Sequence, residues 1–172
     1  GEKFSVSYEW RLGGSSVGSS ASLSLNPSIA AVGDSVACIA SVSDGYGASD
    51  STTATATVQN TDPTMGAVSI TPSTSITVDT ALTCSATGSD LNDGSLTPVY
   101  AWTNSTTGSS LGSSSGLQLS STTASPDDVI ECSVTFTDNN GASIGDSSTV
   151  TIINTAPVFD VGASISPNAG VF

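Results

Sequence analysis

The sequence predicts an all-β fold made of antiparallel β-sandwiches in tandem, and three observations predict it. Val, Ile, Leu and Trp return at alternating positions, as they do in strands with one inward face. Turn residues separate these segments, and no segment keeps a helical period over three turns. The chain also repeats itself after about 94 residues, a period that indicates whole domains rather than a solenoid of short repeats.

The repeat divides the chain into three parts. Its landmarks recur 92 or 94 residues apart: Trp10 and Trp102, Leu23 and Leu117, Leu25 and Leu119, Cys38 and Cys132, and the tetrapeptides NTDP (60–63) and NTAP (154–157). We therefore expect an incomplete repeat with only the later strands over residues 1–65, and a complete repeat over 66–157. Residues 158–172 are expected to be the first strand of a further repeat, or a strand donated to another subunit.

Within the complete repeat, the strands are expected in a regular order. AVSITP and SITVD form a first strand that is broken near Pro72, and ALTCSATG forms the second. PVYAWTNS is the third, and GLQLS is a short strand after it. VIECSVTFT and SSTVTIIN complete the repeat. Short alternating strands separated by turns are typical of an antiparallel sandwich.

The charge of the chain excludes some partners. Fifteen acidic residues face only Lys3 and Arg11, which gives a net charge of −13. Binding to nucleic acid or to anionic lipid would be opposed by repulsion, so neither partner is expected. No apolar run reaches the length of a membrane span, so we expect no membrane insertion of this segment and place any export signal or anchor outside it. The acidic, hydroxyl-rich and lysine-poor composition favours an extracellular or cell-surface location.

The order of Cys84, Trp102 and Cys132 resembles that of immunoglobulin-like domains. The loops SDLNDGS and TDNNGAS are similar to those of the tandem immunoglobulin-like, PKD-like and cadherin-like repeats of large prokaryotic surface proteins. The resemblance implies a disulfide between Cys84 and Cys132 that joins two sheets and packs on Trp102. Such a disulfide implies an oxidising location. Redox or metal-binding cysteines are the alternative.

Two further cysteine and tryptophan positions follow from the repeat. Cys38 corresponds to Cys132, but no partner for it remains in this chain. Trp10 corresponds to Trp102, and both indoles are expected in domain cores. Cys38 is therefore expected to be unpaired within this chain.

No catalytic set is recognisable in the sequence. Histidine is absent, which removes histidine-dependent serine and cysteine catalysis and most zinc sites. The many serines have no base to activate them, and no glycine-rich phosphate loop opens a helix. We therefore expect that this chain is not an enzyme.

Two polar segments are candidate ligand or modification sites. Asp90, Asn92 and Asp93 place oxygen atoms on one loop, and the resemblance to cadherin-like repeats makes them candidate calcium ligands. A solvated turn is the preferred interpretation of this loop, because Asp, Asn and Gly are common turn residues. Asn104 begins the tripeptide NST, a formal N-glycosylation sequon, and residues 103–115 form a Ser/Thr-rich loop for O-linked sugar or simple flexibility.

These observations favour an extracellular structural protein whose domains form, or belong to, a surface filament, fibre or stalk. Its expected partners are further copies of itself, joined head to tail. One alternative is an adhesin that binds carbohydrate or a partner protein, for which Tyr46 is the lone exposed aromatic candidate. Another is an accessory domain of a secreted enzyme.

Overall fold

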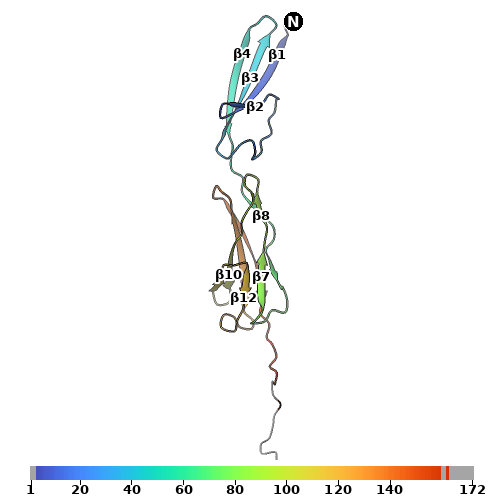
Figure 1. Ribbon diagram of the computed structural model, residues 1–172, viewed down its shortest axis with the longest axis vertical. Helices are drawn as coiled ribbons and strands as arrows, with labels where there is room; N and C mark the ends of the chain where they lie inside the picture. Colours follow the sequence, from blue (N-terminus) through green and yellow to red (C-terminus); the bar gives the residue numbers. More distant parts are fainter. Residues whose placement is uncertain (1–2, 160–161, 163–172) are drawn as a thin grey trace, which may run out of the picture.

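A computed structural model describes residues 3–159 and 162, and every regular element in them is a β-strand. The strands form antiparallel sheets, which confirms the predicted all-β class. Figure 1 shows two bodies arranged end to end, with the first residues of the chain at the far end of the first body. We call strands β1–β4 the first body and strands β5–β14 the second body.

The first body is one four-stranded sheet with the order β2-β1-β3-β4. Its strands are β1 (Phe4–Leu12), β2 (Ser15–Gly18), β3 (Ser35–Asp44) and β4 (Ser49–Thr57). Gly13 and Gly14 close the β1–β2 hairpin with φ angles of 55° and 87°. These angles lie in the left-handed region, which glycine enters without a steric penalty.

The second body contains two larger sheets and one small sheet. The first, with the order β11-β10-β13-β14, comprises β10 (Val99–Asn104), β11 (Ser109–Gly112), β13 (Val129–Thr137) and β14 (Ser143–Thr151). The second, β12-β7-β6, comprises β6 (Ser69–Thr71), β7 (Ala81–Ser85) and β12 (Gly116–Gln118). The small sheet, β5-β8-β9, comprises β5 (Thr64–Met65), β8 (Gly88–Asp90) and β9 (Gly94–Ser95).

The two four-stranded sheets are built in the same register. Trp10 pairs with Cys38 in the first, and Trp102 pairs with Cys132 in the second. Each ladder between this tryptophan strand and the following hairpin strand shifts register directly after the tryptophan. Each indole N–H donates to the carbonyl of a serine 10 or 12 residues later, at 2.9 Å. The repeat in the sequence is therefore also a repeat of strand pairing and side-chain contacts.

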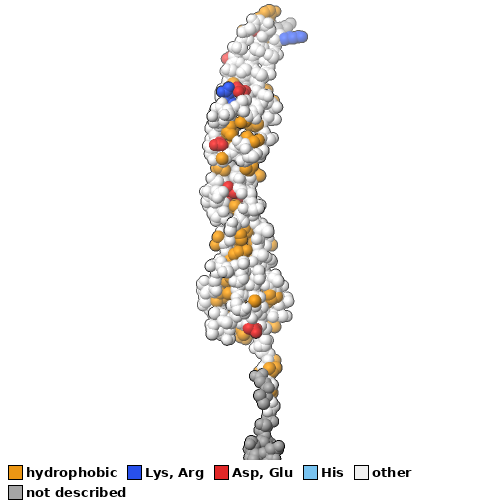
Figure 2. All heavy atoms as spheres, viewed as in Figure 1, with side chains coloured by type: hydrophobic (Ala, Val, Ile, Leu, Met, Phe, Trp, Pro, Cys, Tyr) orange, Lys and Arg blue, Asp and Glu red, His pale blue; other side chains and the backbone are white. Residues whose placement is uncertain are grey.

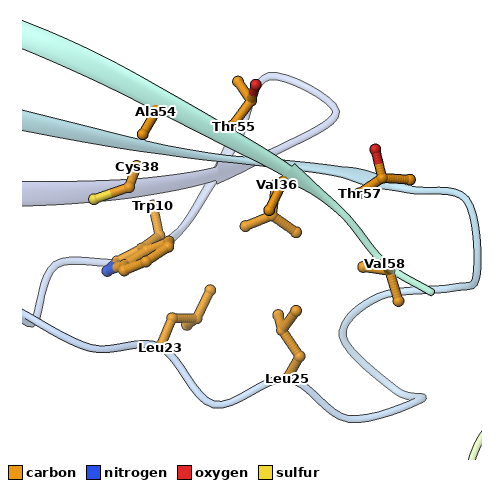
Figure 3. Close-up of a pocket in the computed structure, with 10 residues that line it drawn as sticks. Trp10, Leu23, Leu25, Val36, Cys38, Ala54, Thr55, Thr57 and Val58 are labelled. Carbon is orange, nitrogen blue, oxygen red and sulfur yellow. The ribbon is translucent and has the colours of Figure 1, made fainter.

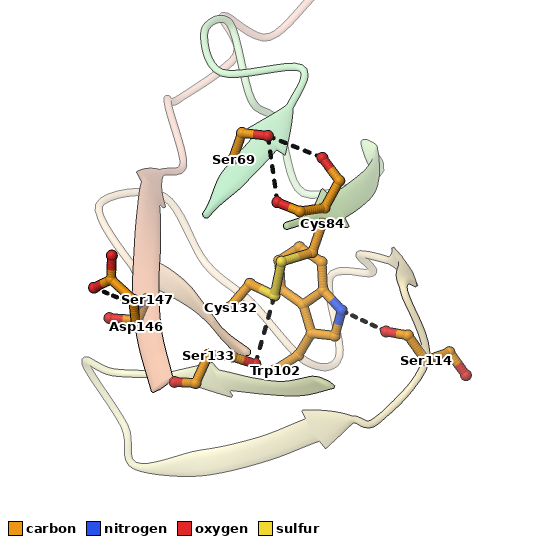
Figure 4. The surroundings of a disulfide bond; sticks show 9 residues. Ser69, Cys84, Trp102, Ser114, Cys132, Ser133, Asp146 and Ser147 are labelled. Carbon is orange, nitrogen blue, oxygen red and sulfur yellow. Dashed lines mark hydrogen bonds between the residues drawn. A yellow bond between two sulfur atoms is a disulfide. The ribbon is translucent and has the colours of Figure 1, made fainter. Parts of the chain in front are cut away.

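A disulfide between Cys84 and Cys132 lies in the core of the second body, beside the indole of Trp102 (Figure 4). It joins β7 to β13, so it links the two larger sheets, and the predicted pairing is confirmed. Trp102 is fully buried, as expected. Apolar side chains from both sheets surround it, among them Ile130 and Leu82. The alternating inward positions of the strands have thus produced one continuous core.

Trp10 differs from its counterpart. It is only half-buried, whereas Trp102 is fully buried, so the expectation of an enclosed core around Trp10 is wrong for the described residues. The physical reason is that the first body is a single sheet, and no described strand covers it as β6 and β7 cover the sheet of the second body. Cys38 is a free, half-buried cysteine in this sheet.

Several boundaries differ from those expected. β5 pairs with β8, so the strands of the second body begin at Thr64, two residues before the expected start at residue 66. Residues 75–79, expected as the second part of the first strand, form no strand, although Ile76 O accepts a hydrogen bond from Ile153 N. The sequence did not predict β8, β9 or β11. Residues 158, 159 and 162 form no strand, and the other residues from 160 to 172 lie outside the described part.

Reduction of the disulfide should destabilise the second body. The bond closes a loop between residues 48 positions apart, and the chain-entropy model gives a loss of about 4 kcal/mol on removal. Thermal unfolding with and without a reductant measures it. The Cys38→Ser variant is the matched control and should show the same loss. A melting temperature that does not change on reduction would contradict this expectation.

Gly88 is required for close packing against Phe136. A Cβ atom at residue 88 would lie 2.4 Å from Phe136 Cγ, and that ring is fully buried. We therefore expect Gly88→Ala to destabilise the protein by about 1–3 kcal/mol. Gly116→Ala is the control, because the nearest atom to its Cβ would be Leu82 O at 3.8 Å. Equal stabilities of the two variants in chemical denaturation would refute the packing argument.

Candidate functional site at the joint between the two bodies

The segment that follows β4 is bonded into the second body. Asn60 Nδ2 donates a hydrogen bond to Asp138 Oδ2 at 2.8 Å. The backbone N–H of Thr61 donates to Asn92 Oδ1 at 3.0 Å. Thr61 Oγ1 lies 2.7 Å from Asn92 Oδ1 and 3.1 Å from Asp90 Oδ2. Residues 60 and 61 therefore form a joint with the second body rather than a free linker.

The loop that receives Thr61 is held by its own hydrogen bonds. Asp90 Oδ1 accepts from the backbone N–H groups of Asn92 at 2.6 Å and Asp93 at 3.0 Å. The carboxylate of Asp93 accepts from the backbone and side-chain nitrogens of Asn139 at 3.0 and 2.6 Å. Asp90 is buried. The loop is thus fixed both to itself and to the turn between β13 and β14.

Asp138 organises that turn. Its Oδ1 accepts from the backbone N–H groups of Asn140 at 2.9 Å and Ala142 at 2.8 Å, which leaves Oδ2 for Asn60. The hydrogen bond from Asn60, followed by those from the turn, lowers the pKa of Asp138 below its ordinary value of 3.8. The ionised carboxylate is therefore the form that holds the joint.

The turn between β3 and β4 has the same construction. Asp44 Oδ1 accepts from Tyr46 N at 2.8 Å and Ala48 N at 2.9 Å, and these bonds lower the pKa of Asp44. No described residue donates to its second carboxylate oxygen as Asn60 does to Asp138. The β3–β4 and β13–β14 turns thus have the same internal hydrogen bonds, and they differ in the additional bond from Asn60 to Asp138.

Apolar contact contributes little to the joint. A shallow hollow between the bodies is lined by Leu25, Pro27 and Ala30 from the first body and by Leu91 and Asn92 from the second. Leu91 remains 72% exposed, so it is not packed between them. The hydrogen bonds of residues 60 and 61 are therefore the specific contacts at the joint.

The predicted calcium ligands lie together at this joint, but their oxygen atoms already accept hydrogen bonds from protein groups. Among the described residues, no cluster of three or more His, Cys, Asp or Glu side chains is arranged for a metal ion. Among the described residues, Asn60 Oδ1 is buried without a hydrogen-bond partner. Calcium binding by Asp90, Asn92 and Asp93 stays a prediction.

Asn104 has a structural role that argues against a glycan on the folded domain. Its side chain is 1% exposed, and its Nδ2 donates to Asp128 Oδ2 at 2.8 Å. Its Oδ1 accepts from the backbone nitrogens of Thr106 and Thr107. A sugar on Nδ2 would have no space and would displace the bond to Asp128. We therefore do not propose glycosylation at this residue.

The sequence identified the Asp90–Asp93 loop but missed its partners Thr61 and Asn139. It also missed the hydrogen bond between Asn60 and Asp138. The available signal was the recurrence of NTDP as NTAP and of SDGYGAS as TDNNGAS. Both motifs were taken as turns and linkers, because the sequence does not show that one binds the other. The structure brings together two predicted sets: the disulfide with Trp102, and Asp90 with Asn92 and Asp93.

No known protein family model matches this chain, and no curated protein matches its sequence. The described residues contain no helix of the length and apolar character needed to cross a membrane.

Removal of the Asn60 side chain should raise the pKa of Asp138 toward 3.8, because it removes the donor that favours the ionised form. The stability that depends on this bond is present above pH 3.8 and is lost as the pH falls through the lowered pKa of Asp138. Carboxyl NMR titration of Asn60→Ala measures the shift. Asp44 is the internal control and should titrate as before. An unchanged pKa at Asp138 would argue against the joint.

If the joint binds calcium, the ion should raise the melting temperature of the native protein and a chelator should lower it, because a ligand of the folded state stabilises that state. Asp93→Asn should weaken the effect, since it removes a charged oxygen ligand. Asp50→Asn, a change in β4 of the first body, is the control. Identical melting curves with calcium and with chelator would rule out the predicted site.

Proposed function

We propose that this chain is a structural segment of an extracellular protein, in which tandem immunoglobulin-like domains form, or belong to, a surface filament, fibre or stalk. The observation that carries the proposal is the joint, where residues 60 and 61 are hydrogen-bonded into the second body. Val58 is hydrogen-bonded to Gly33 and Asp34 before β3, while residues 60 and 61 are bonded to the second body. Few torsions between these contacts stay free, which limits bending between neighbouring domains. An elongated array with stiff joints is suited to bearing load and to spanning distance.

Three further features support this proposal. The bodies are stacked end to end (Figure 1), which is the arrangement that a stalk requires. The disulfide between Cys84 and Cys132 is compatible with an oxidising, extracellular location. The net charge of −13 opposes non-specific association, so contact with further copies is expected at the ends of the chain rather than along its sides.

Adhesion is the second candidate function, and one observation favours it. Tyr46 is 87% exposed in the turn between β3 and β4, at the end of the first body away from the joint. An exposed aromatic ring at the tip of a stalk is suited to stacking on a sugar or packing against a protein. A single ring offers little binding area, so the structural role is preferred.

Electron microscopy of the native material tests the structural proposal. We expect a regular fibre or stalk whose beads have the spacing of the two bodies. A monodisperse globular particle that binds a ligand would contradict it. Loss of ligand binding in Tyr46→Ala, with the particle otherwise unchanged, would favour the adhesin.

A further inference from the structure

The first body has an apolar groove on one face of its sheet (Figure 3). The groove has a volume of about 270 Å³, and the side chains that line it include Trp10, Leu23, Leu25, Val36, Cys38 and Val58. Figure 2 shows apolar side chains gathered on the visible face of this body. An uncovered apolar face of this kind marks an interaction site.

The second body shows what covers the equivalent face. Cys132 and Ile152, the counterparts of Cys38 and Val58, are fully buried there. Phe136 is also fully buried, whereas its counterpart Val42 is 37% exposed. The covering elements in the second body are β6 and β7, which contribute Ile70, Leu82 and Cys84 to the core. The groove therefore lies where β6 and β7 lie in the second body.

The strand at the edge of the second body's β6–β7 pair also has no described equivalent beside the groove. In the second body, β12 pairs with β7, and Leu117 lies opposite Leu82. Leu23 and Leu25 are the counterparts of Leu117 and Leu119, yet residues 22–26 form no strand. Among its described residues, the first body thus has no strand in the position of β12, the strand that pairs with β7 in the second body.

The lining favours an apolar occupant. Ligand pockets usually have a few convergent polar groups that fix the ligand. This groove is lined almost entirely by apolar side chains. Face-to-face packing of two copies would bring together two chains of charge −13. An extended strand with apolar side chains fits the lining, and without charged residues it adds no repulsion at the groove.

We propose that this groove is a strand-docking site for a β6–β7-type strand pair from another repeat of the same kind. The occupant carries apolar side chains at alternate positions and a cysteine that faces Cys38 across the sheets, as Cys84 faces Cys132. The inference rests on the proposed function, because it identifies the partner as a further repeat.

A synthetic peptide of residues 66–87 of this chain is the direct probe, because it contains β6, β7 and Cys84, and its one charged residue is Asp79. The peptide is supplied as a mixed disulfide between its cysteine and glutathione. The Cys38 thiolate attacks the peptide sulfur, a Cys38–peptide disulfide forms, the peptide–glutathione bond breaks, and glutathione leaves as its thiolate. No further oxidant is needed, and intact mass follows the product.

We expect this peptide to react with Cys38 about tenfold or more faster than a scrambled peptide with the same cysteine, because docking raises the local concentration of its sulfur. Leu82→Asp in the peptide should abolish the acceleration, because Leu82 is buried in the second body. Thr83→Asp is the matched control and should retain it, because Thr83 points outward. A Cys84→Ser peptide should slow alkylation of Cys38 without any covalent bond.

Equal rates for the native and scrambled peptides would overturn the inference, as would a disulfide-linked dimer through Cys38 that forms faster than the peptide product. The peptide result is separate from the electron microscopy. A native fibre without peptide acceleration refutes the docking site alone. Acceleration without a fibre supports the docking site and refutes the proposed filament.

Discussion

The carboxylate of Asp138 is the group on which the joint between the two bodies depends. It accepts hydrogen bonds from the backbone of its own turn and from the side chain of Asn60, so one ion fixes a local turn and a long-range contact. The turn presents Oδ2 in a set position, and Asn60 reaches it because β5 holds the following residues against β8. The contact between residues 60–61 and the second body thus depends on a small set of hydrogen bonds.

The sequence predicted the fold class for a physical reason. In a strand, apolar residues at alternate positions all point to the same face of the sheet. In β13 the buried residues Ile130, Cys132 and Val134 follow this alternation. The short strands β8, β9 and β11 were missed because two to four residues are too few to show a period. Their existence depends on neighbouring strands rather than on their own side chains.

The joint could not be predicted in the same way. Asn60 and Asp138 are 78 residues apart in the sequence. Each belongs to a motif whose residue types predict an ordinary turn or linker. At Asn104 the sequence predicted a modification site where the structure shows a structural role. The sequon is visible in the sequence, but the burial of the side chain against Asp128 is not. The role of a polar side chain depends on its hydrogen-bond partners, and only the structure shows these.

Cys38 and Cys132 occupy equivalent positions in the two bodies. Cys132 is bonded to Cys84 of β7, whereas Cys38 is a free cysteine that lines the apolar groove of the first body. The second body thus shows one way in which such a face is covered, and the docking proposal follows from that comparison.

The stiffness of the joint is the central claim, and residual dipolar couplings from the two bodies test it most directly. A stiff joint predicts that couplings from both bodies fit a single alignment tensor with equal magnitude, and that Asn60→Ala separates the two fits. Independent tensors of different magnitude in the native protein would show that the bodies reorient freely, and would contradict the account.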